Sequence, residues 1–318
     1  MTDLLARLTE ARPTDADLDR MWSPADRSAR LDDVLTTRHR RRVGPRVRRT
    51  SLLAAAAALV AFAVPTVLDS GDASAADLRE LARAAVRYDG PVLAEGKWLH
   101  ERSSSVQRNS SLFNDGAVYD NERETWTSWD GTLYIVEHRP SAGWTSYDVL
   151  DEKFEPSIGD PTPAFSATLP DEAGALRDYL DDHVSGSNSH DEALFEAVRT
   201  LTTSHTLPPR TLAAALEVLA GIDGVSTHDV EVSGRPAVEA TFTQHYLDAL
   251  GTSTIVLDRA TGQPLSSEES NPESTYRSTT SLSEVVEAVP ADVLAAFTTY
   301  GDGGITCDAD RPDCSLPR

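Results

Sequence analysis

The chain has 318 residues and a formal net charge of −22 at pH 7. The charge is divided unevenly, because residues 1–50 carry 12 Arg against 8 Asp or Glu, whereas the other 268 carry 17 Lys or Arg against 43 Asp or Glu. The net charge is therefore +4 in the first part and −26 in the second. An acidic body repels phosphate backbones, which argues against nucleic-acid binding there.

The first 37 residues predict three short amphipathic helices, with Thr14 and Ser23 as N-caps of the second and third. So few large apolar side chains cannot close a core, and we expect the segment to fold onto a partner by laying them into grooves. The alternative is a solvated tail that only directs membrane insertion. The expected partner-binding residues are Leu4, Leu8, Leu18, Met21, Trp22, Leu31, Val34 and Leu35.

An uncharged run over residues 50–68 predicts a transmembrane helix. At about 1.5 Å per residue it spans about 28 Å, close to the thickness of a bilayer core. Seven arginines precede the run and Asp69 follows it, so the positive-inside rule places the N-terminus in the cytoplasm. Two alternatives are a signal peptide cleaved near Ala75 and a buried Ala-rich helix. The expected organisation is a cytoplasmic tail over 1–49, one span over 50–68 and an extracytoplasmic domain over 69–318, in the cell membrane.

The pattern after the span predicts a helix, a group of strands, a helical block and a second group of strands. Asp130-Gly131 is typical of a hairpin turn, and four prolines within residues 138–168 predict a loop. This order predicts an α+β domain with antiparallel strands. The expected helices cover residues 76–88, 171–180, 190–204, 209–221 and 291–297, and the expected strands cover 97–102, 117–119, 123–129, 132–137, 225–232, 235–242, 253–257, 263–269 and 275–281.

Several short motifs, in their order along the chain, resemble a family of actinobacterial single-pass membrane proteins. The matching residues are Trp98 with a charged strand, Glu124-Thr125-Trp126 before Asp130-Gly131, Leu169-Pro170-Asp171, Leu207-Pro208-Pro209, Gly234-Arg235-Pro236 and Leu257-Asp258 with Thr261-Gly262. Genes of this largely uncharacterised family lie beside those of extracytoplasmic-function sigma factors, which implies an anti-sigma or sensor role. The extracytoplasmic domain is also similar to the lipoprotein-carrier half-barrel, a curved antiparallel sheet packed by helices, which implies a lipid or lipoprotein ligand.

No motif of a common enzyme class or cofactor site is present, so we expect neither catalysis nor a cofactor. The eight histidines do not pair at metal-ligand spacing, and the tail lacks the cysteines of zinc-binding anti-sigma factors. A serine-containing segment over residues 186–191 reads as a loop and helix cap, because Ser189 and Glu192 fit a capping box.

Three tryptophans, Trp98, Trp126 and Trp129, are candidates to line a ligand cleft. Aromatic residues on a sheet are also common in a packed core, and that alternative stays open.

The two cysteines, Cys307 and Cys314, are expected to form a small disulfide loop in an oxidising compartment, with free thiols as the alternative. Three carboxylates inside that loop, Asp308, Asp310 and Asp313, could hold a hard cation or simply be solvated.

Two functions therefore compete. The first is a membrane-anchored regulator whose tail binds a sigma factor while its extracytoplasmic domain senses an envelope signal. The second is an anchored module that binds a lipid or lipoprotein, with the tail incidental; a structural envelope protein is a third case.

Overall fold

The structure is a computed structural model. The tail expected over residues 1–49 and the membrane span expected over residues 50–68 lie outside the described residues. None of the helices that are described combines the length and the apolar character needed to cross a bilayer. The structure describes residues 70–109, 118–151, 155–185, 188–246 and 249–308, together with Cys314.

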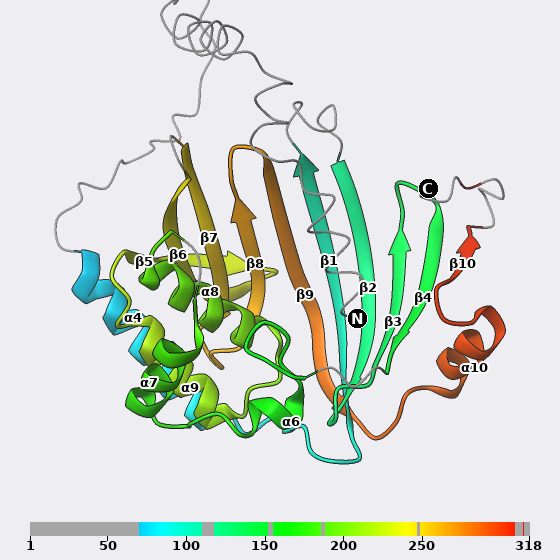
Figure 1. The fold of residues 1–318 in the computed structure, drawn as a ribbon, viewed down its shortest axis with the longest axis horizontal. Coiled ribbons are helices and arrows are strands. Elements are labelled where there is room, and N and C mark those ends of the chain that lie inside the picture. The colour runs from blue at the N-terminus through cyan, green and yellow to red at the C-terminus, as the bar shows by residue number, and fades with distance from the viewer. Residues whose placement is uncertain are drawn as a thin grey trace, which may run out of the picture. The chain divides into compact units, whose positions relative to one another are not determined.

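The described strands form a large, open antiparallel sheet (Figure 1). Its order is β10-β4-β3-β2-β1-β9-β8-β7-β6-β5, so β1 and β9 are neighbours although far apart in sequence. The strands are β1 (Trp98–Asn109), β2 (Val118–Ser128), β3 (Leu133–Arg139), β4 (Trp144–Leu150), β5 (Val225–Val232), β6 (Arg235–Tyr246), β7 (Ala249–Asp258), β8 (Pro264–Ser270), β9 (Ser274–Val286) and β10 (Gly304–Cys307).

Four helices cover one face of the sheet over β5 to β8 (Figure 1). The first turn of α8 forms because Ser189 Oγ accepts the backbone N–H of Glu192 at 3.1 Å, which confirms the predicted cap. The Glu192 carboxylate accepts the backbone N–H of Asn188 at 3.2 Å. The second hydrogen bond of the capping box therefore comes from the residue before the N-cap and not from the N-cap itself. The helices are α4 (Ser70–Arg87), α6 (Pro163–Ser166), α7 (Ala173–His183), α8 (His190–Thr203), α9 (Pro209–Leu219) and α10 (Ala291–Tyr300). The four that cover this face are α4, α7, α8 and α9.

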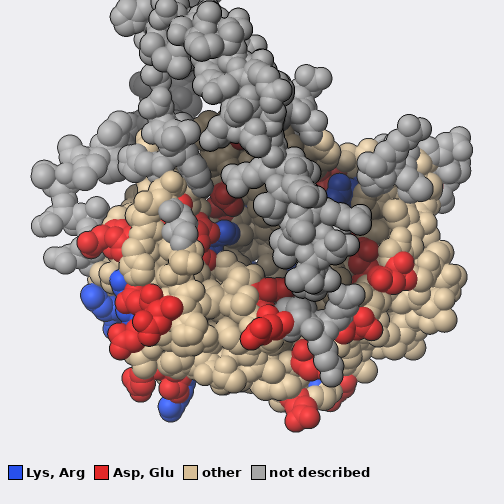
Figure 2. All heavy atoms as spheres, viewed as in Figure 1, with Lys and Arg blue, Asp and Glu red and all other residues tan. Residues whose placement is uncertain are grey.

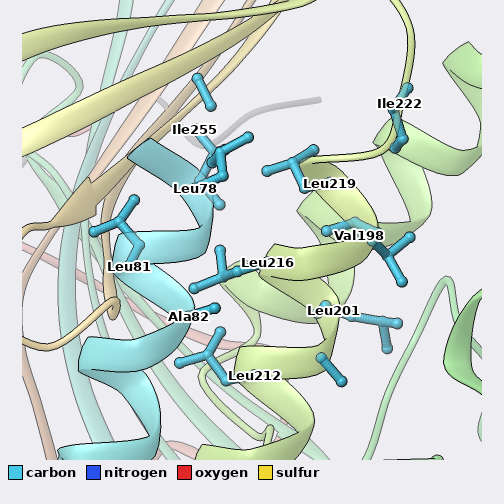
Figure 3. Close-up of a cluster of buried hydrophobic side chains, with 14 of the residues drawn as sticks. Leu78, Leu81, Ala82, Val198, Leu201, Leu212, Leu216, Leu219, Ile222 and Ile255 are labelled. Carbon is cyan, nitrogen blue, oxygen red and sulfur yellow. The ribbon is translucent and has the colours of Figure 1, made fainter. Parts of the chain in front are cut away.

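The hydrophobic core lies between these four helices and strands β5 to β7. Leu212, Leu216 and Leu219 recur at helical spacing on α9 and belong to the same buried cluster as Leu78 and Leu81 of α4 (Figure 3). These five side chains are at most 2% exposed. Burial of each stabilises the fold by roughly 1.5–3 kcal/mol relative to leaving it exposed.

The other half of the sheet has a different cover. Side chains alternate between the two faces of a strand, so Tyr134 and Tyr147 point away from the face that carries the four helices. Phe297 of α10 packs on these tyrosines, with ring centroids 5.0 Å and 5.7 Å away. None of the described helices packs on the upper part of β1 to β4 on the face that carries the four helices (Figure 1).

The predicted α+β class, the main helices and the hairpin at Gly131 are confirmed. The loop expected over residues 138–168 is wrong in part, because it contains β4 and α6. Prolines and glycines flank β4 and obscure its short pattern. Strand β1 continues seven residues beyond the predicted end, to Asn109, because its polar second half faces no hydrophobic layer.

The C-terminal strand β10 pairs with β4, and a disulfide joins Cys307 to Cys314. The Asp308 carboxylate lies 3.2 Å from His138 Nε2 and raises the pKa of that imidazole. The other two carboxylates proposed for a cation site, Asp310 and Asp313, lie outside the described residues. Among the residues that the structure describes, no group of three or more His, Cys, Asp or Glu could hold a metal ion.

Candidate ligand-binding cleft

A cleft lies where the helical layer ends and the sheet continues without it. Its walls come from the α4–β1 linker, the α8–α9 connection and strands β1, β8 and β9. The cavity volume is about 280 Å³, near the lower limit of roughly 300–1,000 Å³ for small-molecule sites. Its lining is mixed, with apolar and aromatic side chains such as Tyr88, Leu93, Trp129, Leu207 and Leu265 beside polar ones.

His205 lines this cleft and lies beside Glu101, which is not itself a lining residue. His205 Nε2 lies 3.5 Å from Glu101 Oε1, and the side chains are 5% and 18% exposed, respectively. Burial raises the pKa of Glu101 to about 8, against a smaller lowering by its hydrogen bond with Ser283. Burial also lowers the pKa of His205 to about 4. Both groups are therefore uncharged near neutral pH, although each could carry a charge in water.

The position of His205 follows from the end of α8. Ser204 is the C-cap, and His205 follows it with φ +54°, a left-handed conformation that is uncommon for residues other than glycine. The hydroxyl group of Thr206 forms hydrogen bonds with the hydroxyl groups of Ser204, at 2.7 Å, and of Ser166 in α6, at 2.6 Å. These hydroxyl contacts hold the turn against α6 and so fix the imidazole beside the cleft.

A polar groove continues from the cleft along the uncovered half of the sheet. Ser103 of β1, in the groove, pairs with Thr280 of β9, in the cleft, so the two depressions adjoin. The groove has a volume of about 450 Å³. At its far end Gln107 pairs with Tyr119 on one side and Tyr276 on the other, and both tyrosines are exposed.

Three of the four ionic side chains that line this groove contact one another. Arg123 and Arg139 both bind the carboxylate of Glu137, at 2.7 Å and 3.1 Å. Their hydrogen bonds and charge outweigh the opposing effect of burial and lower the pKa of Glu137, which stays ionised. The groove therefore presents hydroxyl, amide and phenol groups beside these paired ions and the Asp120 carboxylate, which accepts the backbone N–H of Ser141.

The three tryptophans proposed for a cleft lie on different parts of the sheet. Trp129 lines the cleft, in the turn between β2 and β3. Trp126 is 1% exposed on the opposite face, where its ring stacks on His100 with centroids 4.9 Å apart. Trp98 lies on that same face and packs against Tyr134 at 5.7 Å.

The functional candidates that the sequence did not single out are Glu101 and His205. Neither residue belongs to a motif. Glu101 is one of several charged residues in its strand, and His205 follows the C-cap residue of a helix. A histidine between a helix end and Pro208-Pro209 is a weak local sign of a fixed turn. The tail residues proposed to bind a partner, Leu4, Leu8, Leu18, Met21, Trp22, Leu31, Val34 and Leu35, lie outside the described residues.

Comparisons with known proteins give distant similarities. No family model matches the sequence, and no curated protein matches it. One similar solved structure is MucB in complex with MucA(peri), at 16% identity and a TM-score of 0.29, with 70% of this chain and 58% of the MucB chain covered. Another is an outer membrane lipoprotein-sorting protein domain from Vibrio parahaemolyticus, at 7% identity and a TM-score of 0.22, with 72% and 98% covered. This chain thus spans little more than half of the MucB chain, and TM-scores of this size identify neither a family nor a function.

Proposed function

We propose that the chain is a membrane-anchored regulatory protein of the anti-sigma type. Residues 1–49 bind a sigma factor in the cytoplasm, residues 50–68 cross the membrane, and the extracytoplasmic domain binds an envelope ligand in the cleft beside Glu101 and His205. The domain, a half-barrel of sheet and helices, acts as a sensor rather than a catalyst. The protein is of the actinobacterial kind.

The observation that carries the sensor role is the buried Glu101–His205 pair, of which His205 lines the cleft. Burial of two ionisable groups costs free energy, and groups perturbed in this way gather at functional sites. The charge division of the sequence supports the topology, since a net +4 head precedes the uncharged run and a net −26 body follows it.

The sigma-factor role is tested by a pull-down with the full chain from a lysate of its own cells. We expect the wild-type chain to retain a sigma factor, and the triple variant Leu31→Asp, Val34→Asp, Leu35→Asp to lose it, because charge on the apolar stripe prevents docking in a groove. A matched control places aspartate on the opposite face of the same expected helix, Ala29→Asp with Thr36→Asp. Retention by the triple variant, or no sigma factor with the wild type, contradicts the role.

A second candidate function is an anchored module that binds a lipid or lipoprotein. The apolar part of the cleft lining, which includes Leu93, Leu207 and Leu265, favours it. This function predicts that a lipid copurifies with the full chain and is detected by mass spectrometry. The substitution Leu265→Asp should abolish copurification of the lipid. If the wild type and the variant carry equal amounts of lipid, the lipid is bound outside the cleft, for example around the membrane span. That result would contradict the lipid-binding function.

A further inference from the structure

The groove on the uncovered half of the sheet differs from the cleft in its lining. Among the described residues that border it, none has an aliphatic side chain. Ser105 of β1 lies in the middle of its floor, between Asn121 of β2 and Ser278 of β9. This floor of hydroxyl and amide groups gives an acyl chain no apolar surface to contact, so the groove suits a polar ligand.

The side chain of Asn121 leaves one hydrogen-bond acceptor in the groove without a donor. Its amide nitrogen donates to the carboxylate of Glu137, which can only accept while it is ionised. Its Oδ1 atom is buried and has no hydrogen-bond partner among the described residues. A buried acceptor without a donor costs free energy, and a ligand hydroxyl group placed at Oδ1 would remove that cost.

The charges in and around the groove favour an uncharged ligand. The ionic side chains that line it are two arginines and two carboxylates, Arg123, Arg139, Asp120 and Glu137, whose formal charges sum to zero. Both arginines contact Glu137 and are not available to an anion without loss of those contacts. The domain also repels anions, because acidic side chains outnumber basic ones on the face in view (Figure 2) and residues 51–318 carry a net −26.

Two tyrosines border the far end of the groove. Tyr119 and Tyr276 lie on either side of Gln107 and are 38% and 42% exposed. Since neighbouring strands lie about 4.7–4.9 Å apart, the backbones that carry the two rings are separated by about 9–10 Å. A tyrosine offers an apolar ring face and a polar hydroxyl group. A sugar ring has the complementary arrangement, with C–H groups on its faces and hydroxyl groups around its edge.

An extended peptide fits this groove less well than a sugar does. Peptides that add to a sheet use the unpaired backbone groups of an edge strand. The floor of the groove is formed by β2, β1 and β9, each of which has a strand on both sides. Their backbone groups are therefore engaged within the sheet, and recognition in the groove depends on side chains.

We propose that the polar groove is a second binding site, which binds a short segment of an uncharged saccharide. Hydroxyl groups of the sugar donate to Asn121 Oδ1 and form hydrogen bonds with Ser105 and Ser278, while the face of a ring packs on Tyr276. This inference goes beyond the proposed function. It rests neither on the ligand of the cleft nor on a sigma factor.

The first test is retention of the purified full chain on an array of immobilised saccharides, in a detergent without a sugar head group. The array carries uncharged oligosaccharides and the corresponding ones with carboxylate or sulfate groups. We expect retention by uncharged members that share a ring type, and weaker or no retention by their charged counterparts. No retention by any uncharged member overturns the inference, and so does equal or stronger retention by the charged ones.

Substitutions on the two faces of β1 locate the site. The oligosaccharide retained best is titrated in free form by calorimetry. Ser105→Val should weaken binding at least about tenfold, because valine suits a strand but replaces the central hydroxyl group with methyl groups. Ser104→Val is the matched control, since the neighbouring residue of the same strand points to the opposite face. We expect its affinity to equal that of the wild type. Equal affinity for Ser105→Val would place the sugar elsewhere and overturn the inference.

Two changes at Tyr276 separate packing of the ring from hydrogen bonding. Tyr276→Phe keeps the ring and should keep most of the affinity, whereas Tyr276→Ala should lose at least about tenfold. No loss in Tyr276→Ala would contradict a sugar packed on this ring.

Trialanine serves as a peptide probe in the same calorimeter. Binding of trialanine that is weakened by Ser105→Val, with no saccharide bound, would make the groove a peptide site and overturn the inference. Failure here leaves the proposed function intact, because the pull-down depends on the tail and lipid copurification depends on the cleft.

Discussion

The side chains of Glu101 and His205 are uncharged near neutral pH for the same reason, although their pKa values move in opposite directions. Burial disfavours the charged form of each group, so the pKa of the acid rises to about 8 and that of the base falls to about 4. The turn that carries His205 adds a left-handed backbone at a residue other than glycine. Such conformations are retained where surrounding contacts fix them, here the hydroxyl groups of Ser166, Ser204 and Thr206.

The raised pKa of Glu101 predicts a specific pH dependence of stability. Between about pH 4.5 and 8 the folded chain keeps a proton that the unfolded chain has lost, so its contribution to stability falls as pH rises through this window. Glu101→Gln lacks this loss. We expect the stability of the variant relative to the wild type to grow from pH 4.5 to 8 and then level off. The free energy of unfolding should change by up to a few kcal/mol, since one pKa unit is about 1.4 kcal/mol. The difference between the two melting temperatures should rise in parallel.

The measurement is differential scanning fluorimetry of both chains across that range. His205 is present in both chains, so its opposite dependence largely cancels in the difference. A difference between Glu101→Gln and the wild type that stays constant with pH would mean that the carboxyl group of Glu101 is already ionised in the folded protein.

At the scale of elements, local signals in the sequence predicted those whose pattern faces the core. Helices α8 and α9 begin within a residue of their predicted starts, because Ser189 and Pro209 are strong N-terminal signals and leucines repeat on one side. The second half of β1 was missed because Ser103, Ser105, Gln107 and Asn109 line an open polar groove rather than a hydrophobic layer, and no alternation of apolar and polar residues results. Strand β10, with four residues, is too short to give a pattern.

The turns show how much of an element depends on tertiary packing. Gly234 and Gly262 both have positive φ, the first in the turn between β5 and β6 and the second in the turn between β7 and β8. A Cβ atom on Gly234 would meet nothing within 4 Å, whereas one on Gly262 would lie 2.9 Å from the carbonyl oxygen of Leu81 and 3.1 Å from Ala85 Cβ. The β7–β8 turn therefore packs closely on α4, and the β5–β6 turn does not.

Alanine at these two positions should consequently have different effects. Gly234→Ala should cost roughly 1–2 kcal/mol, the conformational penalty of a left-handed alanine. Gly262→Ala should cost about 2–5 kcal/mol, because overpacking against α4 adds to that penalty. Urea unfolding of both variants checks the difference. Equal losses would show that α4 moves aside without cost.

At the scale of the whole domain, the sequence predicted two groups of strands around a helical block but not how they join. The junction is the pairing of β1 with β9, in which Trp98 lies opposite Val286, and nothing local in either strand indicates this partner. The cleft could not be predicted for the same reason. Its walls come from segments such as Leu93, Trp129, His205 and Val285, which only the completed sheet brings together.

The distribution of the core predicts that the two halves of the sheet differ in stability. The large cluster of buried apolar residues lies between α4, α7, α8, α9 and strands β5 to β7. Strands β2 to β4 instead depend on one layer of aromatic contacts, chiefly Phe297 of α10 against Tyr134 and Tyr147. Segments with fewer buried apolar contacts open at lower free energy, so amides of β3, β4 and β10 should exchange with deuterium before those of β6 and β7.

Native-state hydrogen exchange followed by mass spectrometry measures this order directly. Phe297→Ala should accelerate exchange in β3 and β4, because it removes the aromatic ring that covers Tyr134 and Tyr147, at a cost of roughly 3–5 kcal/mol for a buried phenylalanine. Leu216→Ala, in the main core, should instead accelerate exchange in the helices and in β5 to β8, since Leu216 is 0% exposed among them. If either substitution accelerates exchange equally in all strands, the continuous β1–β9 junction transmits the loss of packing and the sheet opens as one cooperative unit.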